Sequence, residues 1–231
     1  MKKAFTMLEL IFVIVVMGII IAVVTPNTRS NPLQEAAVQL ASHIRYTQHL
    51  AMMDDRFNPN KTHSSGDAYV AANSPIWYRE RWQLAFYSNA YTDGAEAYTI
   101  FSDTVNNSTG NAQASEIAKN PENSAQIMTG GYGSANAIDY NDPEFIGMKK
   151  LNIGKTYGVT SVDLEGGCAN SRLSFDHLGR PLQGDHATMT GPYSAGTQRL
   201  ITSDCTITLS DATDSIVLHI EPETGFVSVA F

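Results

Sequence analysis

The pattern of hydrophobic and polar positions begins with a stretch that is almost entirely apolar. Residues 5–24 contain Thr6 and Glu9 as their only polar side chains. A helix over these 20 residues would rise about 30 Å, which matches the hydrocarbon core of a bilayer. A pair of lysines precedes the stretch, and no basic residue follows before Arg29. The positive-inside rule therefore predicts a cytoplasmic N-terminus and export of the rest of the chain.

The next periodic stretch predicts an amphipathic helix. Asn31, Pro32 and Gln34 match a helix start, because Asn is a good N-cap, Pro suits the first helical position and Gln completes a capping box. After this start, mostly apolar residues recur at spacings of four and three, which places them on one helical face. The predicted face consists of Leu33, Ala37, Leu40, Ile44, Thr47 and Ala51.

Beyond residue 56 the pattern changes to alternation, which is typical of half-buried β-strands. Between the second and third predicted strands, residues 103–147 are rich in Asn, Ser, Gly and Ala. We expect this segment to form a long, variable surface loop with a short helix near residues 115–119. The predicted strands lie near residues 81–86, 97–101, 173–175, 201–209, 216–220 and 226–231.

The charge of the exported part narrows the classes of partner. Of the 15 Lys+Arg and 23 Asp+Glu in the chain, residues 27–231 hold 13 and 22, a net charge of −9. An acidic body of this kind repels a phosphate backbone, so general nucleic-acid binding is disfavoured. The two cysteines, Cys168 and Cys205, follow an export-type N-terminus and predict one disulfide in an oxidising compartment, with two buried thiols as the alternative.

The first residues resemble a known processing site. Lys2-Lys3-Ala4-Phe5-Thr6-Met7-Leu8-Glu9 is similar to the N-terminus of type IV prepilins and type II secretion pseudopilins. The resemblance implies cleavage between Ala4 and Phe5 by prepilin peptidase and N-methylation of Phe5. In this family the residue before the cut is usually Gly, and here it is Ala4. Pro26 matches the proline that commonly ends the membrane-embedded part of the family's helix.

The resemblance also gives Glu9 a role in filament assembly. An isolated carboxylate at the centre of a membrane helix costs about 2.5–3.5 kcal/mol, so such residues are usually functional. In the family's filaments, the corresponding glutamate is thought to pair with the N-terminal amine of a neighbouring subunit. A signal anchor in which Glu9 has no function is the alternative interpretation.

Residues near the C-terminus carry a second resemblance. The pattern that starts at Phe175-Asp176, continues through Pro222-Glu223-Thr224-Gly225 and ends at Val229 is similar to the C-terminal domain of minor, H-type pseudopilins of the GspH/FimT-like group. The two resemblances cover the ends of the chain and leave its middle uncovered.

Together these features predict an α+β fold, in which a long N-terminal helix packs on a C-terminal antiparallel β-sheet domain. The helix would have a membrane half and an amphipathic half. The expected parts are a leader peptide (1–4), a transmembrane or filament-core helix (5–26), an outer amphipathic helix (27–56) and a β-rich periplasmic domain (57–231) with its variable loop at about 103–147.

The predicted function is structural: a minor pilin or pseudopilin of a type II secretion pseudopilus or type IV pilus. The implied partners are prepilin peptidase, other pilin subunits and an inner-membrane assembly platform. The predicted location is the bacterial inner membrane, with a single pass and a periplasmic C-terminal domain, and then the filament. The alternatives are a major pilin, a DNA-uptake pilin, or a signal-anchored periplasmic enzyme or binding protein.

Candidate chemistry elsewhere is sparse. Signatures of nucleotide hydrolysis, serine hydrolase or zinc protease chemistry are missing, so no catalytic residue or cofactor is predicted. A turn residue pair, Asp185 and His186, and the scattered histidines His43, His49 and His177 fit backbone bonding better than metal binding. A loose calcium loop is left open where oxygen ligands concentrate, at Asp139, Asn141, Asp142 and Glu144.

Overall fold

The computed structural model describes residues 6–24, 31–104, 110–133, 137–168, 170–192 and 199–230. The chain divides into two compact units, Met1–Asn31 and Pro32–Phe231. The first unit contains helix α1 (Met7–Val24) and the second contains every other helix and strand described below.

The expectation of one long N-terminal helix with a membrane half is wrong. The helical segment is divided into α1, of 18 residues, and α2 (Pro32–Met53), of 22 residues. At 1.5 Å per residue, α1 is about 27 Å long, whereas a transmembrane helix needs about 20 apolar residues. Within the described residues, no helix combines the length and apolar character required to cross a membrane.

Helix α2 is amphipathic, as its spacing predicts. Its buried side chains recur every three or four residues and include all six members of the predicted apolar face. Ala36 and Ala41 widen that face. Thr47 belongs to it although it is polar, because its hydroxyl donates to the carbonyl of His43 at 2.8 Å within the helix. The buried face thus carries no unsatisfied hydroxyl into the core.

The strands form two four-stranded sheets in which every pair is antiparallel. We call the sheet of order β2-β1-β4-β5 the buried sheet and the sheet of order β3-β6-β7-β8 the open sheet. The buried sheet consists of β1 (Trp82–Tyr87), β2 (Ala97–Ser102), β4 (Arg172–Phe175) and β5 (Pro181–Gln183). The open sheet consists of β3 (Ser161–Gly166), β6 (Cys205–Ser210), β7 (Ser215–Ile220) and β8 (Val227–Ala230).

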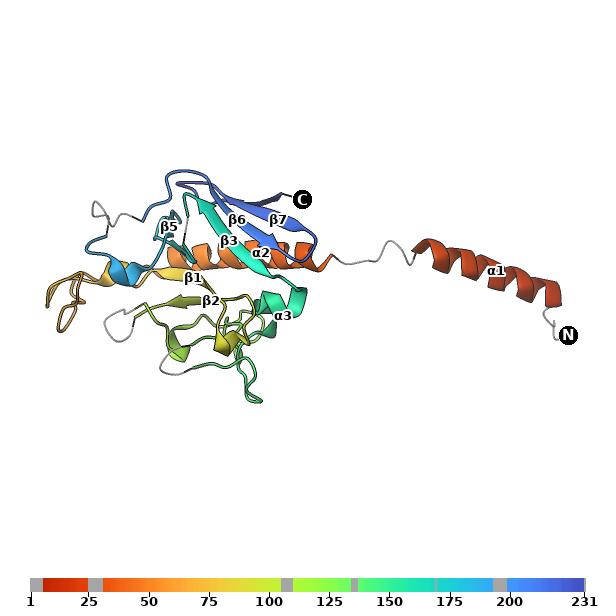
Figure 1. The fold of residues 1–231 in the computed structure, drawn as a ribbon, viewed down its shortest axis with the longest axis horizontal. Helices are drawn as coiled ribbons and strands as arrows, with labels where there is room; N and C mark the ends of the chain where they lie inside the picture. Colours follow the sequence, from red (N-terminus) through yellow and green to blue (C-terminus); the bar gives the residue numbers. More distant parts are fainter. Residues whose placement is uncertain are drawn as a thin grey trace. The chain divides into compact units, whose positions relative to one another are not determined.

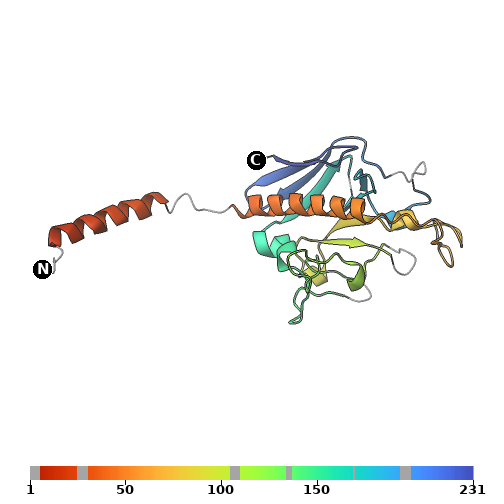
Figure 2. The ribbon, with the colours of Figure 1, turned by 180° about the vertical axis from the view of Figure 1, so that it is seen from behind.

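Both sheets pack against α2, which runs between them (Figures 1 and 2). The α+β class is therefore correct, but the β domain has two sheets. Leu84 and Phe175 come from the buried sheet and Leu218 from the open sheet, and all three meet α2 residues in one apolar core. The remaining helices are short: α3 (Ile153–Tyr157) and the 3-10 turns Trp77–Arg79, Ala90–Thr92, Ala114–Glu116, Lys149–Leu151 and His186–Thr188.

A second, smaller core lies on the other face of the buried sheet. Ala85 and Phe101 project there and pack against Ile117, Ile127 and Tyr132. The segment that the sequence suggests as a variable surface loop thus supplies side chains to a core. Its short helical turn, Ala114–Glu116, lies at the start of the expected helix. The surface-loop prediction did not anticipate this core, because its few apolar residues follow no period.

Candidate functional site

Helix α1 places the one acidic residue of the N-terminal unit in its first turn. Glu9 is exposed, and its backbone N–H lies 3.1 Å from the carbonyl oxygen and 3.4 Å from the hydroxyl of Thr6. A carboxylate in the first turn interacts favourably with the positive end of the helix dipole. Ala4 and Phe5, the residues of the predicted cleavage and methylation site, lie outside the described residues, so that site stays a prediction.

Apart from Glu9, the side chains of α1 described up to residue 21 are apolar, and they are exposed on all sides of the helix. Met7 is 81% exposed, Phe12 69% and Ile21 59%. A helix that is hydrophobic all round is normally buried, because so large an apolar surface is unfavourable in water. Consecutive positions are all exposed, so no single stripe faces a partner within the unit. The surface of α1 is therefore suited to burial against other molecules.

The two cysteines form the predicted disulfide. The sulfur atoms of Cys168 and Cys205 are 1.97 Å apart, and both residues are fully buried. The bond joins the segment between β3 and β4 to the first residue of β6, and so links the connection between the two sheets to the open sheet. Closing a loop of 37 residues stabilises the fold by about 4 kcal/mol in the chain-entropy model.

The calcium candidates form turns. A carboxylate oxygen of Asp139 accepts a hydrogen bond from the backbone N–H of Asn141 at 2.9 Å, and one of Asp142 accepts from Glu144 at 2.8 Å. Both are bonds from a side chain to the backbone two residues later, as in Asx turns. The described part of the chain holds no group of three or more His, Cys, Asp or Glu residues that could bind a metal ion.

The histidines have separate surroundings. The Nδ1 atom of His43 lies 2.6 Å from the hydroxyl of Tyr98, and burial lowers the pKa of His43 to about 4. His49 is exposed on the same helix, and His177 is exposed in the turn after β4. His43 and His49 therefore form no common site.

Asp185 and His186 have structural partners. Asp185 caps the turn His186–Thr188 by accepting from the N–H of Ala187 at 3.0 Å, and it forms an ion pair with Arg172. His186 is buried, with its Nε2 atom 2.7 Å from the hydroxyl of Ser174. Burial, and then the nearby arginines, keep the pKa of His186 well below its ordinary value, so this imidazole is neutral. Asp185 is partly exposed and holds the turn, whereas His186 is closed to solvent, so the two residues act in ordering this loop.

Two features of the folded unit carry no sequence signal. Arg79 is 1% exposed, pairs with Asp67 at 2.6 Å and donates to the carbonyl of Met189. Its charge is therefore satisfied by residues far along the chain, which no local pattern reveals. The second feature is the pair of outer edges of the open sheet, on β3 and β8, with which no residue in the described ranges forms a β-bridge.

Comparison of the chain with family models, with curated proteins and with solved structures gives no match. The candidate functional site is therefore defined by the molecule's own features: the apolar helix α1 with Glu9, attached to a disulfide-bonded α+β unit.

Proposed function

We propose that the protein is a structural, non-catalytic subunit of a pilin-like filament, either a minor pilin or a pseudopilin. The observation that carries the proposal is α1, a helix that is apolar on all sides and has a single carboxylate in its first turn. In the assembled filament, the α1 helices of many copies cover one another. Each Pro32–Phe231 unit then offers its surface to neighbouring subunits.

Glu9 would act as the electrostatic element of this packing. Removal of residues 1–4 would leave a positively charged amine on Phe5, four residues before Glu9 in the sequence. A lone carboxylate among apolar helices is unfavourable, and a neighbour's amine neutralises it. The packing of α1 helices and the removal of the leader are thereby linked, because an unprocessed chain has no amine at this position.

Two further features support an extracytoplasmic site of action. The disulfide between Cys168 and Cys205 is stable in an oxidising compartment and rare in the cytosol. The lysine pair before α1 favours export of the residues that follow it. We propose assembly on an inner-membrane platform after processing by prepilin peptidase, with the filament as the final location.

The first test is the N-terminus of the native protein. Peptide mass spectrometry of protein from native cells should find a chain that starts at methylated Phe5. The same peptide should be absent from a strain that lacks prepilin peptidase. An unprocessed start in both strains would contradict the proposal and favour a signal-anchored protein.

The second test compares two carboxylates in corresponding positions. Glu9 lies in the first turn of α1 and Glu35 in the first turn of α2. Removal of one partner of a buried ion pair costs about 3–5 kcal/mol. Glu9→Ala should therefore abolish recovery in sheared filaments, while Glu35→Ala, the control, is recovered like the unchanged protein. Equal recovery of both variants would refute the role of Glu9.

A further inference from the structure

The edges of the two sheets differ in how they are covered. Thr99 and Phe101 of β2 form β-bridges with Thr129 and Ile117, and Leu182 of β5 forms one with Leu200. Both edges of the buried sheet are thus closed by the chain itself. In the described part of the chain, no residue forms a β-bridge with the outer edge of β3 or of β8.

Two hydrogen bonds show which backbone groups point outward at the two open edges. The N–H of Glu221 donates to the carbonyl of Phe226, and the N–H of Gly167 donates to that of Asp204. Paired residues in an antiparallel ladder alternate between bonded and non-bonded positions. The N–H and C=O groups of Val227 and Val229 therefore point away from β7. By the same alternation, those of Val162 and Leu164 point away from β6.

An apolar groove lies beside the β8 edge. Its volume is about 340 Å³, and it lies between α2 and β8. Two apolar side chains at the groove are largely exposed, Val38 at 54% and Phe226 at 60%. The guanidinium of Arg45 donates to the outward carbonyl of Val227 at 2.8 Å, so a positive charge is fixed at this edge. The groove lining comprises Val38, Ala41, Arg45, Phe226, Val227, Ser228 and Val229.

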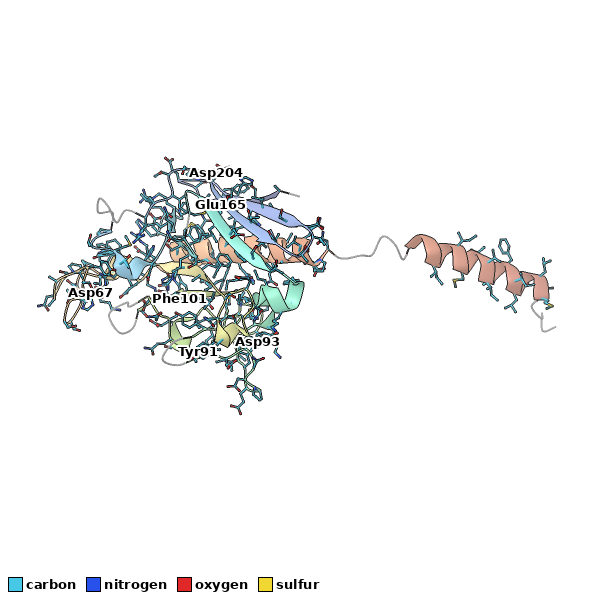
Figure 3. All side chains as sticks on the ribbon, in the orientation of Figure 1. Asp67, Tyr91, Asp93, Phe101, Glu165 and Asp204 are labelled. Atoms are coloured by element: carbon cyan, nitrogen blue, oxygen red, sulfur yellow. A yellow bond between two sulfur atoms is a disulfide. The ribbon has the colours of Figure 1, made fainter. Side chains whose placement is uncertain are left out.

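The charges at the two edges differ in sign. Strand β3 exposes the carboxylates of Asp163 and Glu165, the latter labelled in Figure 3. Strand β8 carries no charged residue, and Arg45 lies at its edge. Two β3 edges would repel each other, as would two β8 edges with their arginines. Pairing of β3 with β8 is the combination in which the charges are complementary.

We propose that β3 of one copy pairs antiparallel with β8 of a second copy, so that the open sheet continues from subunit to subunit. Successive strands of this sheet alternate in direction, so β8 runs opposite to β3. Two copies in the same orientation therefore present antiparallel edges. A contact between two different surfaces generates an open chain of subunits unless the rotation between copies closes a ring. The proposal names a contact of the globular unit and, as a contact within a filament, rests on the proposed function.

Copies of the full chain that carry one added cysteine beside the native disulfide provide the test. In the new ladder, Asp163 and Glu165 of one copy face Ser228 of the other at non-hydrogen-bonded positions, on the uncovered face of the sheet. Opposed side chains there have Cβ atoms about 4.5–5.5 Å apart, close to the disulfide range. Asp163→Cys and Glu165→Cys cover the two nearest registers, and each is mixed with Ser228→Cys copies in mild detergent under gentle oxidation.

The expected result is a cross-linked dimer in one of the two mixtures. Its yield should exceed that of each variant alone by about ten-fold, because pairing raises the local thiol concentration. The control mixture combines Ser228→Cys with Thr208→Cys, which lies on the same face but on the interior strand β6. A yield in both test mixtures no higher than in this control would overturn the proposal.

A backbone variant separates edge pairing from chance collision. Val229→Pro removes an N–H that points outward and leaves the ladder with β7 intact, a position where edge strands tolerate proline. Combined with Ser228→Cys, it should abolish the cross-link while the native disulfide forms, whereas Val229→Ala should retain it. An undiminished cross-link in the proline variant would overturn the proposal.

The outcomes for filament and contact are distinguishable. Processed filaments without the cross-link would refute the sheet pairing and leave the proposed function intact. A cross-link formed by a chain that is never processed would support the pairing and refute the filament.

Discussion

The buried sheet and the open sheet have the same number of strands but different surroundings. Five of the six residues of β1 and all six of β2 are buried, whereas buried and partly exposed residues alternate along β6. Helix α2 covers one face of each sheet, but only the buried sheet has a second core on its other face. Within the described residues, folding thus closes both edges and both faces of the buried sheet, while it leaves one face of the open sheet partly exposed and its two edges without β-bridges.

The difference also concerns polar groups. On its second face, the buried sheet holds Thr99, Gln83 and Ser174, which are at most 1% exposed. The amide group of Gln83 has no hydrogen-bond partner in the described structure, which is costly for a buried side chain. The corresponding face of the open sheet carries Thr206 and Thr208, which solvent can reach. Substitutions should therefore be costly on one sheet and mild on the other.

The largest difference is expected for apolar residues on the second face of each sheet. Phe101→Ala would empty the centre of the small core, where Phe101 is fully buried, and should destabilise the unit by about 3–5 kcal/mol. Val217→Ala on the partly exposed face of β7 should cost less than about 1 kcal/mol. Urea unfolding followed by tryptophan fluorescence measures both changes. Equal losses would show that the second core contributes little to stability.

A buried carboxylate, Asp103, should make the stability of the buried sheet's surroundings depend on pH. Asp103 follows β2, is 1% exposed and accepts a hydrogen bond from the N–H of Gly110. Burial raises the pKa of Asp103 to about 7, from the ordinary value of 3.8 for an aspartate. Between these values the folded state binds more protons than the unfolded state. The stability contributed by Asp103 is therefore complete below pH 4 and is lost as the pH rises towards 7 and above.

Asp103→Asn should remove this loss, because an amide does not ionise. We expect the variant to be more stable than the unchanged protein above pH 7 by about 1–3 kcal/mol, since one pKa unit corresponds to about 1.4 kcal/mol. Unfolding curves from pH 4 to pH 8 measure the effect. Asp163→Asn, which removes an exposed carboxylate from the open sheet, is the matched control. Identical dependences of stability on pH for the two variants would contradict the raised pKa of Asp103.

Helices and strands whose burial follows a local period can be predicted from the sequence. Prediction from the sequence fails where the burial of a residue depends on segments that are distant along the chain. The face of α2 is confirmed residue by residue, and the strands β1, β2 and β7 are close to their expected positions. Strand β3 was missed, because its two apolar residues, Val162 and Leu164, alternate with the acidic pair that keeps its edge exposed. The second core was missed because Ile117, Ile127 and Tyr132 are scattered among polar residues with no period.

The candidate functional site was likewise predictable only in part. Glu9 stands out in the sequence because a single carboxylate interrupts an apolar run. The disulfide is confirmed, and a count of two cysteines in an export context is enough to predict it. The open edges of β3 and β8 and the place of Arg45 depend on which strands are neighbours. Alternation gives the faces of a strand, but it does not specify the neighbouring strand.

The smallest predicted difference comes from one chemical change made on both sheets. The hydroxyl of Thr99 in β2 lies 2.7 Å from that of Thr129, and both residues are fully buried. Thr99→Ala leaves the hydroxyl of Thr129 without this partner and should cost about 1–2 kcal/mol. Thr208→Ala, on the outer face of β6, should change stability by less than about 0.5 kcal/mol. Urea unfolding at one pH measures both variants. The Thr129 hydroxyl also accepts from the backbone N–H of Gly131 at 3.2 Å, so Thr129 itself is left unchanged in this comparison. If Thr99→Ala costs no more than Thr208→Ala, the buried hydroxyl pair adds nothing to stability, and the contrast between the two sheets reflects burial of apolar volume alone.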